Sequence, residues 1–291
     1  MSAYSSKILE RIIENTNTTI HKGIIIASPS TLPPYKYHWI RDSALVMRVF
    51  IDKYEQTKDS EYFEYIMNYI ENETKVQDLN TLSGLGEPKI NIDCTPFNGE
   101  WGRPQNDGPA LRGIMMLKII KLFKFNYDII INRLIIPIIL KDLEYILENY
   151  NKVSFDIWEE HIGWHFYTRL VQLKFIKDIC KELKLFKFPE TKIDTIKIVE
   201  EKIIQSINHH IGKNERGNYI ISSFDENGGI IKYEDSANIL ALCHIDFDDT
   251  ILNIFGLDSI LHTCDNLLNF FRSKYNYKDL NLIGRYIDDK Y

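Results

Sequence analysis

The stretch Trp101-Gly102-Arg103-Pro104-Gln105-Asn106-Asp107-Gly108-Pro109-Ala110-Leu111-Arg112 leads a long loop into a helix. Asp107 suits the N-cap of that helix, because an N-cap carboxylate accepts hydrogen bonds from free N–H groups, and the glycine and proline after it suit the first turn. Apolar residues then recur at helical spacing over 109–124. Capping does not explain Trp101 or Arg103, although a loop tryptophan is more often packed than ligand-facing.

Helical periodicity extends along the whole chain. Apolar residues recur at three-to-four spacing in eight further segments, 5–15, 43–54, 60–71, 129–148, 165–186, 192–208, 236–245 and 258–274. Few runs alternate as strands do, and the short ones at 24–26 and 219–221 stand beside turn residues. The sequence therefore predicts an all-α protein.

Four long loops separate these helices, and long loops in a compact domain usually carry function. They span residues 19–41, 76–107, 149–163 and 209–235. Each precedes the second, fourth, sixth or eighth predicted helix, which suggests an outer ring of odd helices and an inner ring of even ones. The N-terminal ends of the inner helices would then face one side, where free N–H groups suit hydroxyl oxygens. We expect the site on that side, where the four loops meet. The loop at 209–235 shows no recognisable function and is interpreted as surface structure.

The composition is that of a globular protein, with 44% hydrophobic and 26% charged residues in a chain of 291. A net charge of −6 without a lysine or arginine block argues against nucleic-acid binding. The most apolar stretch, 129–147, contains charged residues and a proline, so no membrane span is expected. Charges within residues 1–11 argue against a secretory signal, and the four cysteines lack metal or redox spacing. The sequence predicts an intracellular protein.

The first loop ends in the run Tyr37-His38-Trp39-Ile40-Arg41-Asp42-Ser43 at a predicted helix start. Planar rings cover the C–H faces of sugars and charged groups bind vicinal hydroxyls, so this run is suited to sugar binding. The ordinary alternative is that Asp42 caps the helix beside an ion pair with Arg41. The run alone leaves both interpretations open.

The third loop holds Phe155-Asp156-Ile157-Trp158-Glu159-Glu160-His161, with three carboxylates in five residues beside a tryptophan. Crowded like charges and an apolar wall both raise a carboxyl pKa, which lets a glutamic acid stay protonated and act as a general acid. The alternative is a solvated acidic turn before a helix, where the helix dipole favours acidic residues. Taken alone, the acidic turn is the better interpretation.

In combination these runs resemble glycoside hydrolase family 15, the glucoamylases, in motif and in order along the chain. The resemblance rests on Trp-x-Arg-Asp-Ser at 39–43, the run at 101–112 and Asp-x-Trp-Glu-Glu at 156–160. Weaker matches follow at 235–238, 271–273 and 284–289. The resemblance therefore covers nearly the whole chain.

The resemblance implies an (α/α)6 barrel that removes glucose from the non-reducing ends of α-1,4- and α-1,6-linked glucans, malto-oligosaccharides included. The reaction would proceed with inversion and without a cofactor. Residue by residue, Glu159 looks like the general acid, and Asp156 and Glu160 look like its supporting and substrate-binding neighbours. Arg41 and Asp42 would hold the terminal glucose. The resemblance assigns the rest of the sugar pocket to four aromatic residues and one arginine, Trp101, Trp39, Tyr37, Trp158 and Arg285.

An inverting glycosidase also needs a second carboxylate as general base. In the family this base lies near the C-terminus, in a part that has no counterpart in residues 1–291. We therefore expect residues 1–291 to be one incomplete catalytic domain that lacks about its last three helices. Loss of the base lowers the rate by roughly 10²–10⁴, unless Asp288 or Asp289 substitutes. The open edge would expose apolar helix faces, which predicts a protein partner or self-association there.

Three functions remain compatible with these residues. The first is a hydrolase, either acting alone or completed by a separate chain that supplies the base. The second is a sugar-binding protein that keeps Arg41, Asp42 and Trp101 but has lost turnover. The third is a helical scaffold whose motifs persist for capping and packing. Glucan binding separates the third function from the others, and glucose release separates the first two.

Overall fold

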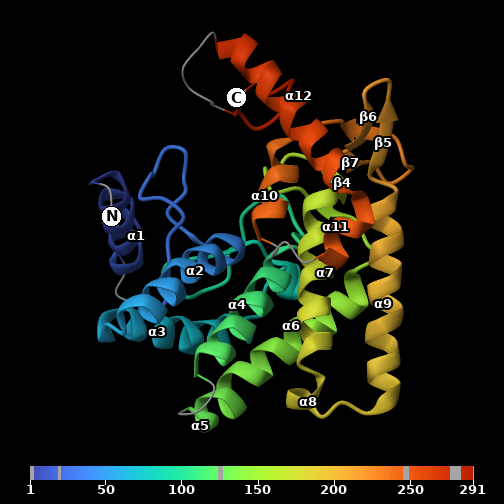
Figure 1. Ribbon diagram of the computed structural model, residues 1–291. Coiled ribbons are helices and arrows are strands. Elements are labelled where there is room, and N and C mark those ends of the chain that lie inside the picture. Colours follow the sequence, from blue (N-terminus) through green and yellow to red (C-terminus); the bar gives the residue numbers. More distant parts are fainter. Residues whose placement is uncertain (1–2, 19–20, 124–126, 245–248, 276–282, 291) are drawn as a thin grey trace. The chain divides into compact units, whose positions relative to one another are not determined.

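The computed structural model describes residues 3–18, 21–123, 127–244, 249–275 and 283–290. The chain divides into two compact units, Met1–Glu148 and Asn149–Tyr291. Helices dominate each unit (Figure 1), so the all-α prediction is confirmed.

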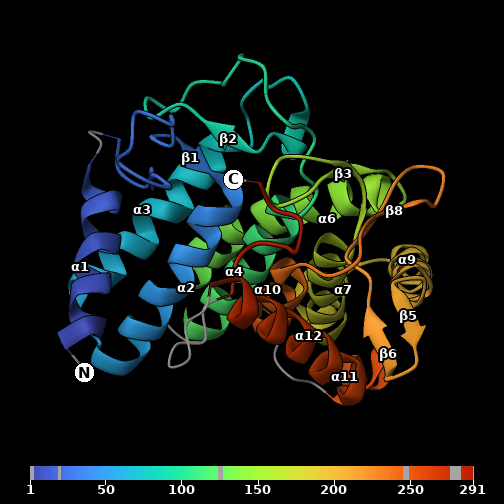
Figure 2. The same ribbon diagram turned by 90° about the horizontal axis from the view of Figure 1, so that it is seen from above.

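The first unit is built from helices that pack around a buried one. Its elements are α1 (Ala3–Asn17), β1 (His38–Trp39), α2 (Ile40–Thr57), α3 (Ser60–Val76), the 3-10 turn η1 (Gly84–Gly86), β2 (Lys89–Ile90), α4 (Gly108–Phe123), α5 (Asp128–Ile130), the π-helical turn η2 (Ile131–Ile135) and α6 (Ile136–Asn149). Helix α4 packs against α2 (Figure 2). Every α4 residue except Lys118, Lys121 and Leu122 is buried, as expected of a helix that is apolar on all sides.

Two short strands join the loops of the first unit. β1 pairs with β2 in antiparallel register, with His38 opposite Ile90 and Trp39 opposite Lys89. Because β1 directly precedes α2, this pairing brings the loop at 76–107 to the N-terminal end of that helix. The shared end predicted for the loops before α2 and α4 is thus present within this unit.

In the second unit, too, helices pack around a buried helix, α7. Its elements are β3 (Ser154–Phe155), β4 (Ile162–His165), α7 (Phe166–Lys181), α8 (Leu183–Phe186), α9 (Glu190–Asn208), β5 (Ile211–Asn214), β6 (Gly217–Ile220), β7 (Ser223–Phe224), β8 (Ile230–Lys232), α10 (Ser236–His244), α11 (Asp249–Phe255) and α12 (Leu257–Tyr275). Helix α7 is buried except at Lys177, Cys180 and Lys181, and it packs against α9 and α10 (Figure 1).

A four-stranded antiparallel sheet, in the order β3-β4-β7-β8, joins the two loops of the second unit. β4 lies between β3 and β7, with Trp164 opposite Phe224. The close approach requires a glycine at 163, because a Cβ there would lie 2.2 Å from the carbonyl oxygen of Phe224. The sheet fixes residues 149–163 beside residues 209–235.

Several predicted element boundaries were wrong. The helix predicted at 129–148 is interrupted by η2 just before Pro137, whose ring and missing N–H disturb the regular helical hydrogen bonds. The helix predicted at 165–186 ends at Lys181, and α11 was not predicted. Residues 24–26 form no strand, because their N–H groups donate to His21, His38 and Asn15. Residues 124 and 245, at the ends of two predicted helices, lie outside the described residues.

Candidate functional site

In the first unit, Arg41 is held by the loop that precedes α4. Its Nη1 donates to Gln105 Oε1 at 2.9 Å and to Asp107 Oδ2 at 2.8 Å. Asp42 Oδ2 lies 3.9 Å from Arg41 Nε, so the neighbouring carboxylate is the weaker partner. Nor is Asp42 the N-cap of α2, a position occupied by Trp39.

The structure corrects the interpretation of Asp107 as a side-chain cap of α4. It does precede α4, and Leu111 N donates to its backbone carbonyl. Its side chain, however, binds Arg41 through Oδ2, while Oδ1 is buried without a hydrogen-bond partner among the described residues. The Asp107 side chain therefore binds the arginine and does not cap the helix. Its second oxygen bears the energetic cost of a buried acceptor without a hydrogen bond.

Four aromatic rings surround the fully buried Lys89 on β2. Its Nζ lies 3.0 Å from the ring centroid of Trp101, 4.3 Å from that of Phe97, 4.4 Å from that of Tyr37 and 4.6 Å from that of Trp39. Cation–π attraction of this kind orients the rings relative to one another. The structure therefore gathers the three aromatic residues that the sequence predicted for a sugar pocket in this unit, around a lysine that the sequence analysis missed.

Trp101 also carries an unused donor. Its indole Nε1 is buried and has no hydrogen-bond partner among the described residues. Its ring meets Trp39 edge-on at 6.0 Å and Phe97 edge-on at 6.3 Å. A buried N–H without an acceptor is energetically unfavourable. Arg103 has a structural role instead, because it binds Glu87 through Nε and Nη2 at 2.9–3.1 Å.

A buried ionic network supports this arrangement. Arg112 on α4 contacts Asp142 on α6 at 2.6 Å and Glu73 on α3 at 3.0 Å, and all three side chains are buried. Glu73 also lies 2.9 Å from His38 Nε2, while Ile25 N donates to His38 Nδ1. The Nδ1 atom must therefore be the acceptor, and Nε2 carries the proton. The network ties β1 to three helices.

In the second unit, Asp156 organises the acidic turn. Its Oδ1 accepts from the backbone N–H of Glu160 at 2.8 Å and of His161 at 3.3 Å, and its Oδ2 accepts from Lys232 Nζ at 2.8 Å. Burial by itself would raise the Asp156 pKa, but the Lys232 charge and these hydrogen bonds outweigh it and lower that pKa. Asp156 is thus an ionised turn-former, unsuited to donating a proton.

Glu159 occupies a strained position in the same turn. Its φ is +63°, in the left-handed region that residues with a Cβ rarely adopt, and its N–H donates to Asp156 O at 3.0 Å. Strain of this kind is found where the surrounding contacts fix it, often at functional sites. Here the Asp156 hydrogen bonds hold the backbone of the turn in this conformation.

Glu160 is paired with residues from the far end of the chain. Its Oε1 lies 2.8 Å from Arg285 Nη1, and its Oε2 accepts from the Tyr286 hydroxyl at 2.6 Å. Arg285 also binds Asp289 through Nε at 2.9 Å and Nη2 at 2.6 Å, and these bonds raise its pKa. The structure thus brings Glu160 and Arg285 together, and Asp289 binds the same arginine.

Trp158 is anchored by a carboxylate that precedes α10. Its Nε1 lies 2.9 Å from both side-chain oxygens of Asp235, and the Arg285 guanidinium lies 5.4 Å from its ring centroid. Asp235 also accepts from Ala237 N at 2.8 Å, and burial raises its pKa to about 6. Asp235 therefore sets the orientation of the indole.

Lys232, on β8, connects these groups. Its side chain is 6% exposed, and its Nζ lies 2.8 Å from Asp156, 3.4 Å from Glu160 and 3.7 Å from Asp235. The interpretation of residues 209–235 as surface structure was wrong, because β7 and β8 deliver Lys232 and Asp235 to the acidic turn. No local motif marks this lysine. The weak match at 235–238 was the only signal near it.

No group of three or more His, Cys, Asp or Glu side chains among the described residues could hold a metal ion. No helix in the described part of the chain is long and apolar enough to cross a membrane.

Comparisons with known proteins identify chains that are similar to this one. The chain is 31% identical to the intracellular sporulation-specific glucoamylase of Saccharomyces cerevisiae, over 97% of this chain and 57% of that protein. It is 39% identical to a probable glucoamylase of Schizosaccharomyces pombe, over 55% of this chain and 37% of that protein. The chain thus spans only part of the length of these relatives.

Solved structures give the fold class. Saccharomycopsis fibuligera glucoamylase matches with a TM-score of 0.83 at 25% identity, over 97% of this chain and 65% of that one. Hormoconis resinae glucoamylase matches with a TM-score of 0.84 at 28% identity, over 100% of this chain and 52% of that one. The predicted fold class is confirmed, since the chain matches part of an (α/α)6 barrel. The family model of glycosyl hydrolases family 15 matches residues 3–291, and the chain belongs to that family.

Proposed function

We propose that this chain binds the non-reducing ends of α-1,4- and α-1,6-linked glucans and that Glu159 donates a proton to the glycosidic oxygen. The turn at 156–160 carries the proposal. Asp156 is kept ionised by Lys232, Glu160 binds Arg285, and Glu159 has a φ of +63° in the same turn. Family membership and the glucoamylases among its relatives support the choice of glucan.

The sugar-binding groups of the first unit are proposed to be Arg41, Asp42, Trp101, Trp39 and Tyr37. Arg41 is 11% exposed and is held in place by Asp107 and Gln105, so little conformational freedom is lost when it binds vicinal hydroxyls. Trp101 is only partly buried, which supports a stacking contact between its ring and the sugar. Trp158 and Arg285 are proposed to contact sugar in the second unit.

Turnover by this chain alone is proposed to be slow. Inversion needs a second carboxylate about 6.5–9.5 Å from the acid, with room for a water. Four carboxylates near the acidic turn already have partners: Asp156 binds Lys232, Glu160 and Asp289 bind Arg285, and Asp235 binds the Trp158 indole. A rate about 10²–10⁴ below that of a complete site is expected, and a partner chain or a second copy is a candidate source of the base.

The same pairing favours a second candidate, a sugar-binding protein without turnover. Glucose release from maltotriose, measured beside calorimetric titration of maltotriose, separates the two functions. Glu159→Gln is the test variant, and Glu215→Gln, an exposed acidic residue in the β5–β6 turn, is the matched control.

Loss of release in Glu159→Gln by about 10²-fold or more, with Glu215→Gln unchanged, supports the proton-donor role. Binding without release by the unaltered chain supports the sugar-binding protein. A folded chain that neither binds maltotriose nor releases glucose contradicts both functions and favours a helical scaffold.

An intracellular location is also proposed. All four cysteines are free thiols, which is usual in a reducing compartment, and one matched relative is described as intracellular. Residues 1–291 are proposed to act as one incomplete catalytic domain, a prediction supported by the family match over 3–291.

A further inference from the structure

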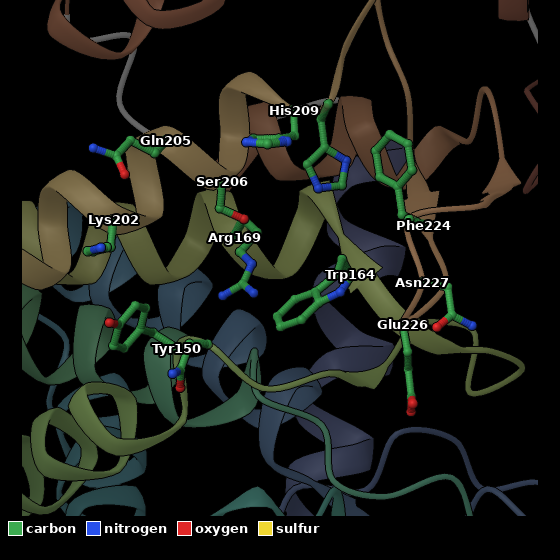
Figure 3. A pocket seen from close by; sticks show the side chains of 13 residues that line it. Tyr150, Trp164, Arg169, Lys202, Gln205, Ser206, His209, Phe224, Glu226 and Asn227 are labelled. Atoms are coloured by element: carbon green, nitrogen blue, oxygen red, sulfur yellow. The ribbon is translucent and has the colours of Figure 1, made fainter.

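A cavity lies within the second unit, and no residue of the acidic turn at 156–160 lines it. It has a volume of about 680 Å³ and is lined from α7, α9, the strand β4, the segment after α6 and the β7–β8 turn (Figure 3). Small-molecule sites commonly have volumes of about 300–1,000 Å³. The cavity is therefore large enough for a ligand of the size of a monosaccharide derivative.

A buried arginine without a carboxylate partner marks this cavity. Arg169 on α7 is 4% exposed. Its contacts are a long hydrogen bond from Nη1 to Gln172 Oε1, 3.4 Å, and the ring of Trp164, whose centroid lies 4.5 Å from the guanidinium carbon. No further hydrogen bond or ion pair of Arg169 exists among the described residues. Arg112 and Arg285 differ, since each binds a carboxylate through two nitrogens.

A desolvated guanidinium without a counterion is unfavourable, and burial lowers the Arg169 pKa to about 10. At neutral pH the group is still charged. Since its five N–H donors form a planar fork that matches the oxygens of phosphate, an incoming anion would replace the lost solvation. The cavity is thus preorganised to bind negative charge.

The side chains near Arg169 add hydrogen-bond donors and one further positive charge to the cavity. Lys202 and Ser206 line the cavity from α9 and His209 lines it from the residue after that helix, supplying an ammonium, a hydroxyl and an imidazole. Glu226 also lines it, but its side chain points away from Arg169 (Figure 3). His210 adds no charge, because burial lowers its pKa to about 3.

Aromatic and amide groups complete the lining. Trp164 and Tyr150 lie beside Arg169 (Figure 3), and their rings can cover an apolar C–H face. Asn151, Gln205 and Asn227 offer amide groups for hydroxyls. We propose that this cavity binds a sugar phosphate, with the phosphate on Arg169 and Lys202 and the sugar ring against Trp164.

Calorimetric titration of the full chain with glucose 6-phosphate tests the proposal. The variant is Arg169→Met, and the matched control is Lys197→Met, which removes an exposed charge from α9 outside the cavity. We expect binding to the unaltered chain, at least tenfold weaker binding to Arg169→Met and unchanged binding to Lys197→Met. Arg169→Met should keep its fold, because an apolar side chain replaces an unpaired buried charge, and circular dichroism checks this.

Competition distinguishes the parts of the ligand. Inorganic phosphate should displace glucose 6-phosphate, and glucose at the same concentration should not. Displacement by glucose would place the ligand in a sugar site and overturn the proposal. Equal affinity for inorganic phosphate and glucose 6-phosphate would overturn the sugar contact. Absence of glucose 6-phosphate binding, or equal binding by both variants, would overturn the whole proposal without affecting the glucan function.

Discussion

Replacing Lys232 by methionine should destabilise the second unit strongly and in a pH-dependent way. The change removes the cation that lies within 3.7 Å of Asp156, Glu160 and Asp235, and it leaves Asp156 and Asp235 buried. Removing one partner of a buried ion pair costs about 3–5 kcal/mol, because the remaining charge loses its counterion. We expect a loss in this range at pH 8, where the carboxylates are ionised.

The loss should shrink as the pH falls. In the unaltered chain Lys232 outweighs burial and lowers the Asp156 pKa, so without the lysine burial should raise that pKa. The pKa of Asp235 is already raised to about 6. A carboxyl whose pKa is higher in the folded than in the unfolded state favours folding once it is protonated. Since one pKa unit corresponds to about 1.4 kcal/mol, proton uptake should recover roughly 1–3 kcal/mol between pH 8 and pH 5.

Urea unfolding followed by tryptophan fluorescence measures this effect. The free energy of unfolding of Lys232→Met and of the unaltered chain is compared at pH 5, 6.5 and 8. Lys213→Met, an exposed lysine on β5, is the control and should stay within about 0.5 kcal/mol. A loss no larger than that of Lys213→Met, or a loss that grows toward pH 5, would refute the reasoning.

Two further predictions concern the scaffold. Arg112→Met should lower the free energy of unfolding by about 3–5 kcal/mol, because Glu73 and Asp142 would face each other buried without a cation. Thermal unfolding measures this loss, and a change below about 1 kcal/mol would contradict it. Gly163→Ala should cost about 1–3 kcal/mol or more, since its Cβ would lie 2.2 Å from the Phe224 carbonyl oxygen. Hydrogen exchange of the β4 and β7 amides should then rise, and unchanged exchange would show that the sheet accommodates the methyl group.

The spacing of apolar residues along the chain was sufficient to predict most of the long helices. Spacing of apolar residues located both ends of α2, α4, α9 and α12 to within about three residues, because each helix buries a face set by its own sequence. The same spacing failed to predict η2, which lies just before a proline, and α11, which is too short to show a helical period. Motif order also identified the acidic turn, because Asp156, Trp158 and Glu160 stand close together in the chain.

Partners from distant segments could not be predicted in this way. Lys232 stands 76 residues after Asp156 and has no motif of its own. Asp107 has the sequence context of a helix cap, yet its carboxylate binds Arg41, 66 residues earlier. Capping uses a local N–H group, and the partly buried Arg41 guanidinium competes for the same carboxylate only once the loops have folded together.

The sequence by itself determined the helical class, the family resemblance and the candidates Arg41, Trp101, Glu159 and Arg285, since these depend on periodicity and on short runs. The tertiary structure decided which charges are neutralised and which rings are fixed. β1 and β2 deliver Lys89 to the aromatic rings, and β7 and β8 deliver Lys232 to the acidic turn. The physical reason is that ion pairing and desolvation depend on distance in space and on burial, which residue spacing along the chain does not specify.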